Sequence, residues 1–153
     1  MIIGSEIIFL SNVVSTNTTA ADYIRSGMTR EGMVIRAGYQ SAGKGQLGNS
    51  WESEDGKNLL FSIILFPNML AATEQFLLCE FISLGIHDYL NTIISGCKIK
   101  WPNDIYAGDD KIAGILIENS LAGNAITSSV AGIGLNINQE IFSEQIPNPV
   151  SLK

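Results

Sequence analysis

The sequence has few of the residues from which zinc sites, disulfide frameworks and nucleic-acid surfaces are built. Two cysteines and one histidine are too few for an ordinary structural zinc site. Cys79 and Cys97 stand far apart in apolar stretches, so we expect buried thiols and a reducing, cytoplasmic location. Nine Lys and Arg residues against fifteen Asp and Glu give a net charge of −6, which argues against binding to duplex nucleic acid.

Charged residues of either sign are also scarce. They make up 16% of the chain against 46% hydrophobic residues, and the mean hydropathy of +0.22 excludes a disordered chain. The longest uncharged stretch, residues 119–139, is interrupted by Ser, Thr and Asn, so no membrane crossing is expected. No basic residue precedes the first apolar run, so no signal peptide is expected. A length of 153 residues suits one domain with one sizeable core.

Apolar runs separated by turn residues predict more strands than helices. Strands are predicted at residues 5–10, 33–39, 58–66, 98–100, 105–107, 111–119 and 125–135. Helices are predicted over residues 15–24, with capping oxygens at its start, and over residues 73–93. Two helices cannot cover both faces of a parallel sheet, so the expected fold is α+β with a mixed β-sheet.

The longer predicted helix should turn a wide apolar stripe toward the core. His87 lies in the middle of it, where a structural or exposed role is more expected than a catalytic one. Residues 136–153 contain Pro147 and Pro149 and are expected to close no core, so we interpret the chain as truncated before its next element. The stripe consists of Leu77, Leu78, Phe81, Ile82, Leu84, Ile86 and Tyr89.

A glycine-rich loop, residues 40–50, follows the second predicted strand. Residues 38–45 nearly match the phosphate loop G-x-x-x-x-G-K-[S/T], but Gly45 stands where a hydroxyl is needed. Residues 43–48 match G-x-G-x-x-G, yet the helix that dinucleotide binding requires does not follow. Backbone N–H groups of such a loop can approach an anion, with Lys44 supplying charge. A mobile turn with a solvated lysine is the alternative.

The segment Lys-Trp-Pro-Asn-Asp, residues 100–104, predicts a demanding bend between two strands. Asp104 and Lys111 should then face one site across a hairpin. An aspartate can hold Mg²⁺, and a lysine can neutralise a carboxylate or phosphate oxygen. A surface salt bridge is the alternative. Gly132 and Gly134 weaken the last strand unless something approaches it closely.

Together these segments resemble the catalytic domain of the biotin protein ligases, a fold similar to that of class II aminoacyl-tRNA synthetases. The string Lys-Trp-Pro-Asn-Asp followed by Lys-x-x-Gly-Ile-Leu is the most specific part. The landmarks occur in the family's order over nearly the whole chain. They are residues 15–17 (Ser-Thr-Asn), 39–45 (Tyr-Gln-Ser-Ala-Gly-Lys-Gly), Trp51, 58–59 (Asn-Leu), 100–104, 111–118 (Lys-Ile-Ala-Gly-Ile-Leu-Ile-Glu) and 132–136 (Gly-Ile-Gly-Leu-Asn).

The resemblance implies an ATP-dependent ligase that modifies a protein in two steps. Biotin's carboxylate attacks the α-phosphate of Mg-ATP, giving biotinyl-5′-AMP and pyrophosphate, and a lysine of a biotin carboxyl carrier protein then attacks the adenylate. Biotin and ATP are the implied substrates, with Mg²⁺. A homodimer is left open, and no DNA binding is expected because no helix-turn-helix domain precedes the catalytic part. The family's small carboxyl-terminal β-domain is missing too, so residues 1–153 are interpreted as one truncated catalytic domain.

The resemblance also implies roles for the residues at matching positions. Biotin binding is implied for Ser15, Thr16, Asn17, Gln40, Gly43, Lys44, Gly45, Gln46, Lys111, Gly114, Gly132 and Gly134. ATP binding is implied for Lys44, Gln46, Trp51, Asn103 and Asn136. Catalytic roles are implied for Lys111, Lys44 and Asp104, and Asp104 is also the implied Mg²⁺ ligand. The three strand glycines should leave room for the ligand against the sheet.

One part of the loop departs from the family pattern. Family members commonly carry arginine where Lys44 stands, and many carry further arginines at the positions of Gln46 and Asn49. Lipoate ligases share the fold but lack the Lys-Trp-Pro-Asn-Asp segment. Three interpretations therefore stay open: a biotin ligase, a lipoate-type acyl ligase, and a non-catalytic biotin-binding fragment.

Overall fold

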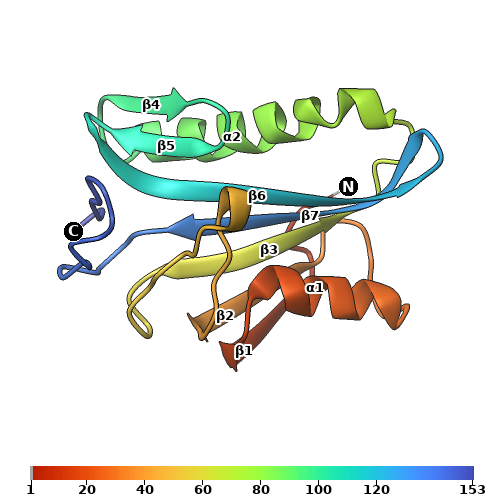
Figure 1. Ribbon diagram of the computed structural model, residues 1–153, viewed down its shortest axis with the longest axis horizontal. Coiled ribbons are helices and arrows are strands. Elements are labelled where there is room, and N and C mark those ends of the chain that lie inside the picture. The colour runs from red at the N-terminus through yellow and green to blue at the C-terminus, as the bar shows by residue number, and fades with distance from the viewer. Residues whose placement is uncertain (1) are drawn as a thin grey trace.

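One mixed sheet of seven strands carries the fold in the computed structural model, which describes residues 2–153 (Figure 1). The strand order is β1-β2-β3-β7-β6-β5-β4, and only the pair β1 and β2 is parallel among these strands. The strands are β1 (Ile7–Val13), β2 (Val34–Gln40), β3 (Leu59–Leu65), β4 (Cys97–Lys100), β5 (Asp104–Ala107), β6 (Asp110–Ala122) and β7 (Ala125–Leu135). The helices are α1 (Thr16–Arg25) and α2 (Phe76–Asn91), with short 3-10 turns η1 (Gln46–Gly48) and η2 (Ala72–Glu74). The predicted α+β fold with a mixed sheet is confirmed.

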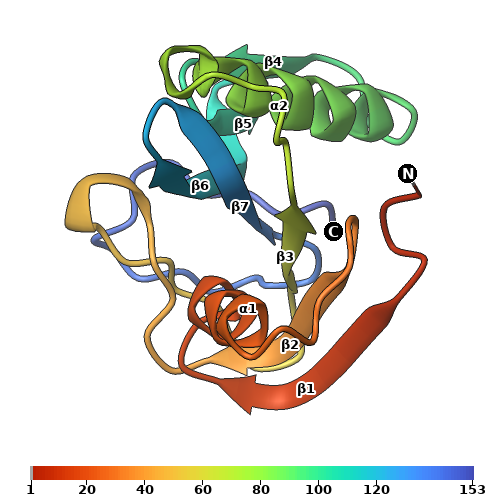
Figure 2. The ribbon, with the colours of Figure 1, turned by 90° about the vertical axis from the view of Figure 1, so that its right-hand side faces the viewer.

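The two helices pack on opposite faces of the sheet. Successive side chains of a strand point to opposite faces, and β3 shows this division at the sheet centre. Ile63 and Leu65 join the apolar cluster that includes α2, whereas Ile64 packs in the cluster that includes α1. Figures 1 and 2 show α2 beside β4 and β5, with α1 beside β1 and β2. The face of α1 also carries the candidate site.

The register of β6 and β7 brings glycines together on the face of α1. Gly114 lies opposite Gly134, and Leu116 lies opposite Gly132. On the other side of β7, Gly132 is paired with Ser62 of β3, whose hydroxyl contacts the first turn of α1. Polar and glycine residues thus replace apolar ones on this face, and a hollow forms in front of the sheet.

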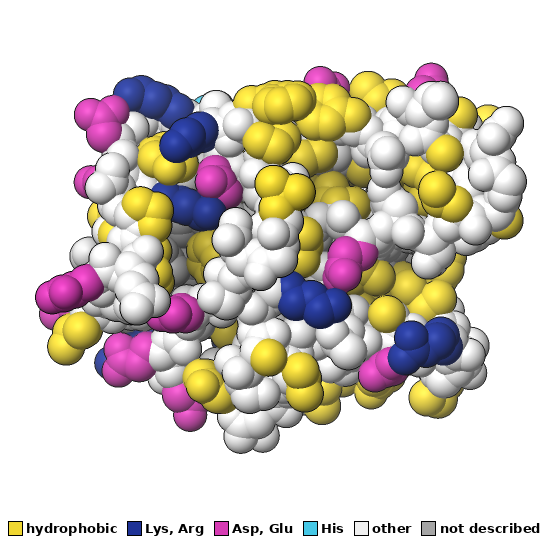
Figure 3. All heavy atoms as spheres, in the orientation of Figure 1, with side chains coloured by type: hydrophobic (Ala, Val, Ile, Leu, Met, Phe, Trp, Pro, Cys, Tyr) yellow, Lys and Arg dark blue, Asp and Glu magenta, His cyan; other side chains and the backbone are white. Residues whose placement is uncertain are grey.

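The wide apolar stripe predicted for α2 is only half buried, so that part of the prediction is wrong. Leu78, Ile82 and Ile86 pack against the sheet. Leu77, Phe81 and Leu84 are 49%, 59% and 52% exposed, and Tyr89 is exposed too. A helix resting on a sheet buries one row of side chains, and the second row lies to its side. Hydrophobic side chains accordingly reach the surface on the side of the molecule where α2 lies (Figure 3).

The expectation that residues 136–153 close no core is also wrong. Val150 and Leu152 pack against the apolar cluster of α2 and β4 to β7. The backbone N–H of Lys111 donates to the carbonyl of Asn148 at 2.6 Å, and the N–H of Val150 donates to the carbonyl of Lys111 at 3.0 Å. These bonds use residues on either side of Pro149, which has no N–H to donate. The prolines disfavour a regular strand here, but they allow this short backbone pairing with Lys111.

The two cysteines are free thiols, as predicted. Cys97 is buried, whereas Cys79 is only partly buried. Burial raises the pKa of both thiols, so both stay protonated at neutral pH. No helix in the described part of the chain is long and apolar enough to cross a membrane.

The buried side chain of Ile64, at the centre of the sheet, should contribute strongly to stability. It is 0% exposed, so Ile64→Ala leaves a cavity and should lower the free energy of unfolding by about 2–5 kcal/mol. Urea denaturation followed by circular dichroism measures the change. Ile141→Ala, at a position 82% exposed, is the control and should change it by less than about 0.5 kcal/mol. Equal effects of the two substitutions would contradict the assigned core.

Candidate active site

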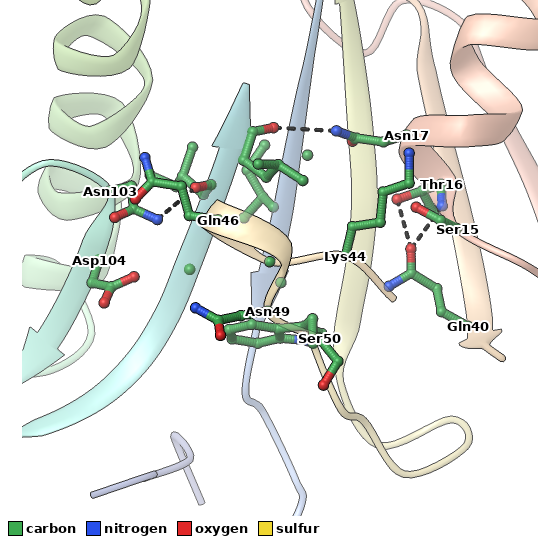
Figure 4. A pocket seen from close by; sticks show the side chains of 18 of the residues that line it. Ser15, Thr16, Asn17, Gln40, Lys44, Gln46, Asn49, Ser50, Asn103 and Asp104 are labelled. Atoms are coloured by element: carbon green, nitrogen blue, oxygen red, sulfur yellow. Dashed lines mark hydrogen bonds between the residues drawn. The ribbon is translucent and has the colours of Figure 1, made fainter. Parts of the chain in front are cut away.

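A cavity of about 180 Å³ opens between the start of α1, the glycine-rich loop and the strands β6 and β7 (Figure 4). Four stretches distant in sequence meet around it. Every residue predicted to bind biotin lines it except Gly43, which is buried in the base of the loop. The lining residues are Ser15, Thr16, Asn17, Gln40, Lys44, Gly45, Gln46, Asn49, Ser50, Trp51, Asn103, Asp104, Lys111, Gly114, Ile115, Leu116, Gly132, Ile133 and Gly134.

One end of the cavity is a polar network held by the first turn of α1. The backbone N–H and the Oγ1 hydroxyl of Thr16 both donate to Oε1 of Gln40, at 2.7 and 3.0 Å. Ser62 Oγ donates to Asn17 Oδ1 at 2.6 Å and lies 2.8 Å from Thr16 Oγ1. Ser15 holds the predicted N-cap position, but within the described residues its side chain makes no capping hydrogen bond. Figure 4 shows the side chains of Ser15, Thr16, Asn17 and Gln40 together beside the cavity.

Trp51 and Asn17 occupy the space in front of the strand glycines. A Cβ atom on Gly134 would lie 2.3 Å from Trp51 Cε2, and one on Gly114 would lie 2.7 Å from Trp51 Cζ3. A Cβ atom on Gly132 would lie 2.2 Å from Asn17 Oδ1. The prediction that these glycines admit a close neighbour is confirmed, but in this structure the neighbours are protein side chains.

Asp104 and Lys111 face each other across the hairpin of β5 and β6, as predicted. Lys111 Nζ lies 2.8 Å from Asp104 Oδ1, and the two side chains are only 26% and 20% exposed. The centroid of the Trp51 ring lies 5.6 Å from Lys111 Nζ. The pair is therefore more shielded from water than the surface salt bridge that was the alternative expectation. Its charges are accordingly less screened.

A second cavity, of about 380 Å³, adjoins the first and shares Trp51 and Lys111 with it. It is lined by Trp51, Lys111 and Asn136 together with residues of the carboxyl-terminal stretch. The residues predicted to bind ATP are thus divided, because Lys44, Gln46 and Asn103 line the first cavity instead. The remaining lining residues are Asn49, Ser50, Glu52, Phe142, Gln145, Ile146, Pro147 and Pro149.

Two residues that were not among the predicted site residues form hydrogen bonds with side chains that line the first cavity. Ser62 bonds Asn17 from the sheet, and Glu118 bonds both Asn17 and Lys44. Ser62 is the one hydroxyl in the apolar run of residues 58–66, and a lone hydroxyl in a buried strand could have revealed it. Glu118 ends the landmark segment of residues 111–118, but its partners are not apparent from the sequence.

Comparison with known proteins agrees with this geometry. Residues 10–136 match the model of the biotin/lipoate A/B protein ligase family. The chain belongs to this family. Three relatives illustrate the match.

The first relative of the family is the "Bifunctional ligase/repressor BirA" of Bacillus spizizenii. It is 32% identical over 152 residues, which cover 96% of this chain and 44% of that protein. The biotin–[acetyl-CoA-carboxylase] ligase of Paracoccus denitrificans is 32% identical over 133 residues, covering 84% of this chain and 53% of the relative. The chain spans about half the length of these relatives.

A solved structure gives the same result for the fold. The biotin protein ligase from Aquifex aeolicus, in complex with biotin and ATP, superposes with a TM-score of 0.79 at 28% identity. The superposition covers 96% of this chain and 59% of that chain. The expected ligase family and fold are therefore confirmed, whereas the roles of individual residues remain predictions.

The contact between Trp51 and the strand glycines can be tested by filling the space beneath the indole. Gly134→Ala places a methyl carbon 2.3 Å from Trp51 Cε2, which is too close, so the indole should move outward and become more accessible to acrylamide quenching. Gly85→Ala on α2 is the control, because a Cβ atom there meets nothing within 4 Å. Trp101, at 70% exposure, gives a constant background in both variants. Identical quenching in Gly134→Ala and Gly85→Ala would contradict the packing of Trp51 on β7.

Proposed function

We propose that this chain is the catalytic part of a biotin–protein ligase, which activates biotin as biotinyl-5′-AMP and transfers it to a lysine of a biotin carboxyl carrier protein. The observation that carries the proposal is the position of Lys111. Its ammonium group lies in a shielded pair with Asp104 and borders both cavities. The names of the similar ligases and the Aquifex complex with biotin and ATP support this choice of substrates.

The first cavity is the proposed biotin pocket. The ureido ring is neutral and needs both donors and acceptors. Two bonds from Thr16 fix the amide of Gln40, so its NH₂ group remains free to donate. The Ser15 hydroxyl can donate or accept at the same end of the cavity. Biotin's carboxylate would then extend from this polar end toward Lys111.

The second cavity is the proposed nucleotide site. Biotin's carboxylate and the α-phosphate of ATP are both anions, and they must meet at the boundary between the cavities. Lys111 stands at this boundary and would neutralise the oxygens on which negative charge develops, an effect that is strongest where water is excluded. Asp104 holds the ammonium group in place. We propose that Trp51 packs beside the nucleotide and that Asn136 contacts it.

Magnesium would enter with ATP rather than as a resident ion. In the described part of the chain, no three His, Cys, Asp or Glu side chains gather to hold a metal. Mg²⁺ is commonly bound by one or two carboxylates together with substrate phosphates. Asp104, at the edge of the first cavity, is the carboxylate proposed for this role.

In the second step, the amine of the carrier lysine attacks the carbonyl carbon of the adenylate. The bond from this carbon to the phosphate oxygen breaks, AMP leaves, and an amide forms. Lys44 and Lys111 would stabilise the negative oxygens during this exchange. The partner is therefore a biotin carboxyl carrier protein, and the proposed location is the cytoplasm, where ATP is abundant.

Adenylate formation distinguishes the three interpretations. The purified chain is incubated with radiolabelled ATP and either biotin or lipoate, and the acyl-adenylate is separated by chromatography. A biotin ligase forms biotinyl-AMP only, whereas a lipoate-type ligase forms the lipoyl adenylate. Biotin binding without any adenylate identifies the non-catalytic fragment and overturns the proposed activity.

Removing the Lys111 ammonium should abolish adenylate formation with the fold intact. Lys111→Ala loses the charge opposite the reacting oxygens, and such losses typically lower the rate by roughly 10²–10³. Lys98→Ala is the control, because Lys98 pairs with Asp109 at the exposed end of the neighbouring hairpin. Pyrophosphate release measures the rate, and circular dichroism checks the fold. Near-normal adenylation by Lys111→Ala would remove this lysine from the mechanism.

The departure at Gln46 should affect how long the adenylate is held. Arginine forms a charge-assisted fork with phosphate or carboxylate, whereas glutamine is neutral. A gain of about 1.4 kcal/mol in Gln46→Arg would slow release of biotinyl-AMP roughly tenfold. Trapping the adenylate and timing its escape measures this, with Lys44→Gln expected to speed release. An unchanged lifetime in Gln46→Arg would show that the side chain at position 46 does not contact the adenylate.

A further inference from the structure

The carboxylate of Glu118 joins two parts of the site with its two oxygens. Oε2 accepts a hydrogen bond from Asn17 Nδ2 at 2.7 Å, and Oε1 accepts one from Lys44 Nζ at 3.3 Å. Glu118 stands on β6, Asn17 lies in the first turn of α1, and Lys44 belongs to the glycine-rich loop. One side chain thus connects a strand, a helix and a loop that are distant in sequence.

The hydrogen bond from Asn17 to Glu118 helps to fix the orientation of the buried Asn17 amide. Asn17 Nδ2 also reaches the carbonyl of Leu116 at 3.3 Å, and Asn17 Oδ1 accepts from Ser62 Oγ at 2.6 Å. Both amide hydrogens are therefore engaged, and the amide can lie in one orientation only. Because the oxygen lies where a Cβ atom of Gly132 would be, this orientation shapes the cavity wall.

The bond to Lys44 lies at the boundary of the cavity. A third cavity, of about 290 Å³, lies outside it, and both Asn17 and Lys44 line the inner and the outer cavity. Glu118 lines the outer cavity only, so its carboxylate stands behind the pocket wall. The side chains of Lys44 and Glu118 are 47% and 44% exposed, and a pair so exposed contributes little to global stability. Its effect should therefore be local, on the position of the loop.

We propose that Glu118 is a positioning residue for biotin binding. One carboxylate oxygen orients the Asn17 amide in the pocket wall, and the other holds Lys44, and with it the glycine-rich loop, against the pocket. The inference rests on the proposed function, since the ligand is biotin. It adds a residue that reaches the substrate only through two others.

Two substitutions separate the two contacts of Glu118. Glu118→Gln keeps an oxygen that can accept from Asn17 but loses the charge that attracts Lys44. Because the loop is then no longer held against the pocket, the biotin dissociation constant of this variant should rise about twofold, and hydrogen exchange of amides 43–50 should become faster. Glu118→Ala loses both contacts, so biotin binding should weaken about tenfold and the loop should exchange as in Glu118→Gln.

The measurements are calorimetric titration with biotin and hydrogen exchange followed by mass spectrometry, both on the full chain. Glu80→Gln, an exposed position on α2, is the matched control for charge and should change neither quantity. Lys44→Gln alone should speed loop exchange, and combining it with Glu118→Gln should add nothing further. If Glu118 acted through general stability instead of through Lys44, the effects of the two substitutions on loop exchange would add.

Each part of the proposal has an outcome that overturns it. Unchanged biotin affinity in Glu118→Ala would show that the contact between Glu118 and Asn17 does not contribute to biotin binding. Equal loop exchange in wild type and Glu118→Gln removes the contact to Lys44. Equal loss of affinity in both variants overturns the division between the two oxygens. If wild type binds no biotin, the proposed function fails, and loop exchange in the ligand-free chain still tests the link between Glu118 and Lys44.

Discussion

The close approach of Trp51 to the backbone of β6 and β7 is the contact on which the rest of the site depends. It requires glycine on both strands, because a Cβ atom at Gly114 or Gly134 would overlap the indole. The ladder between the strands places these two glycines opposite each other, so one ring covers both. Trp51 and Lys111 both line each of the two cavities.

The two faces of the sheet differ: one packs the larger apolar core, and the other carries the candidate site. The face of α2 carries a continuous apolar cluster that includes Ile63, Leu65, Ile115 and Ile133. On the other face, polar side chains and glycines take many of the positions near the site, and Ile64 belongs to a smaller apolar cluster beneath α1. This division is possible because successive side chains of a strand, such as those of β3, point to opposite faces of the sheet. Substitutions at the site can therefore change ligand binding while the larger core stays intact.

Several polar side chains around the start of α1 form hydrogen bonds with one another. Asn17 bonds Ser62, Glu118 and a strand carbonyl, while Gln40 receives two bonds from Thr16. A buried polar group without a partner is costly, so such a network holds its members in single orientations. Amides fixed in this way would suit the neutral ureido ring that is proposed to bind there. The charges of Lys44 and Lys111 lie where the anionic part of the substrates is proposed to bind.

The sequence by itself determined the strands, the mixed sheet and the family. Apolar runs between turn residues predicted β7 with its observed bounds, and they also predicted the hairpin across which Asp104 pairs with Lys111. These features are local, because propensity, turns and hairpin pairing act over a few residues. The tertiary structure alone decided which row of α2 is buried, that the carboxyl-terminal stretch closes the core, and that Trp51 covers the glycines. It also decided the partners of Asn17, since its bonds to Ser62 and Glu118 span 45 and 101 residues of sequence. Contacts at such separation depend on how the sheet brings strands together, which no local pattern encodes.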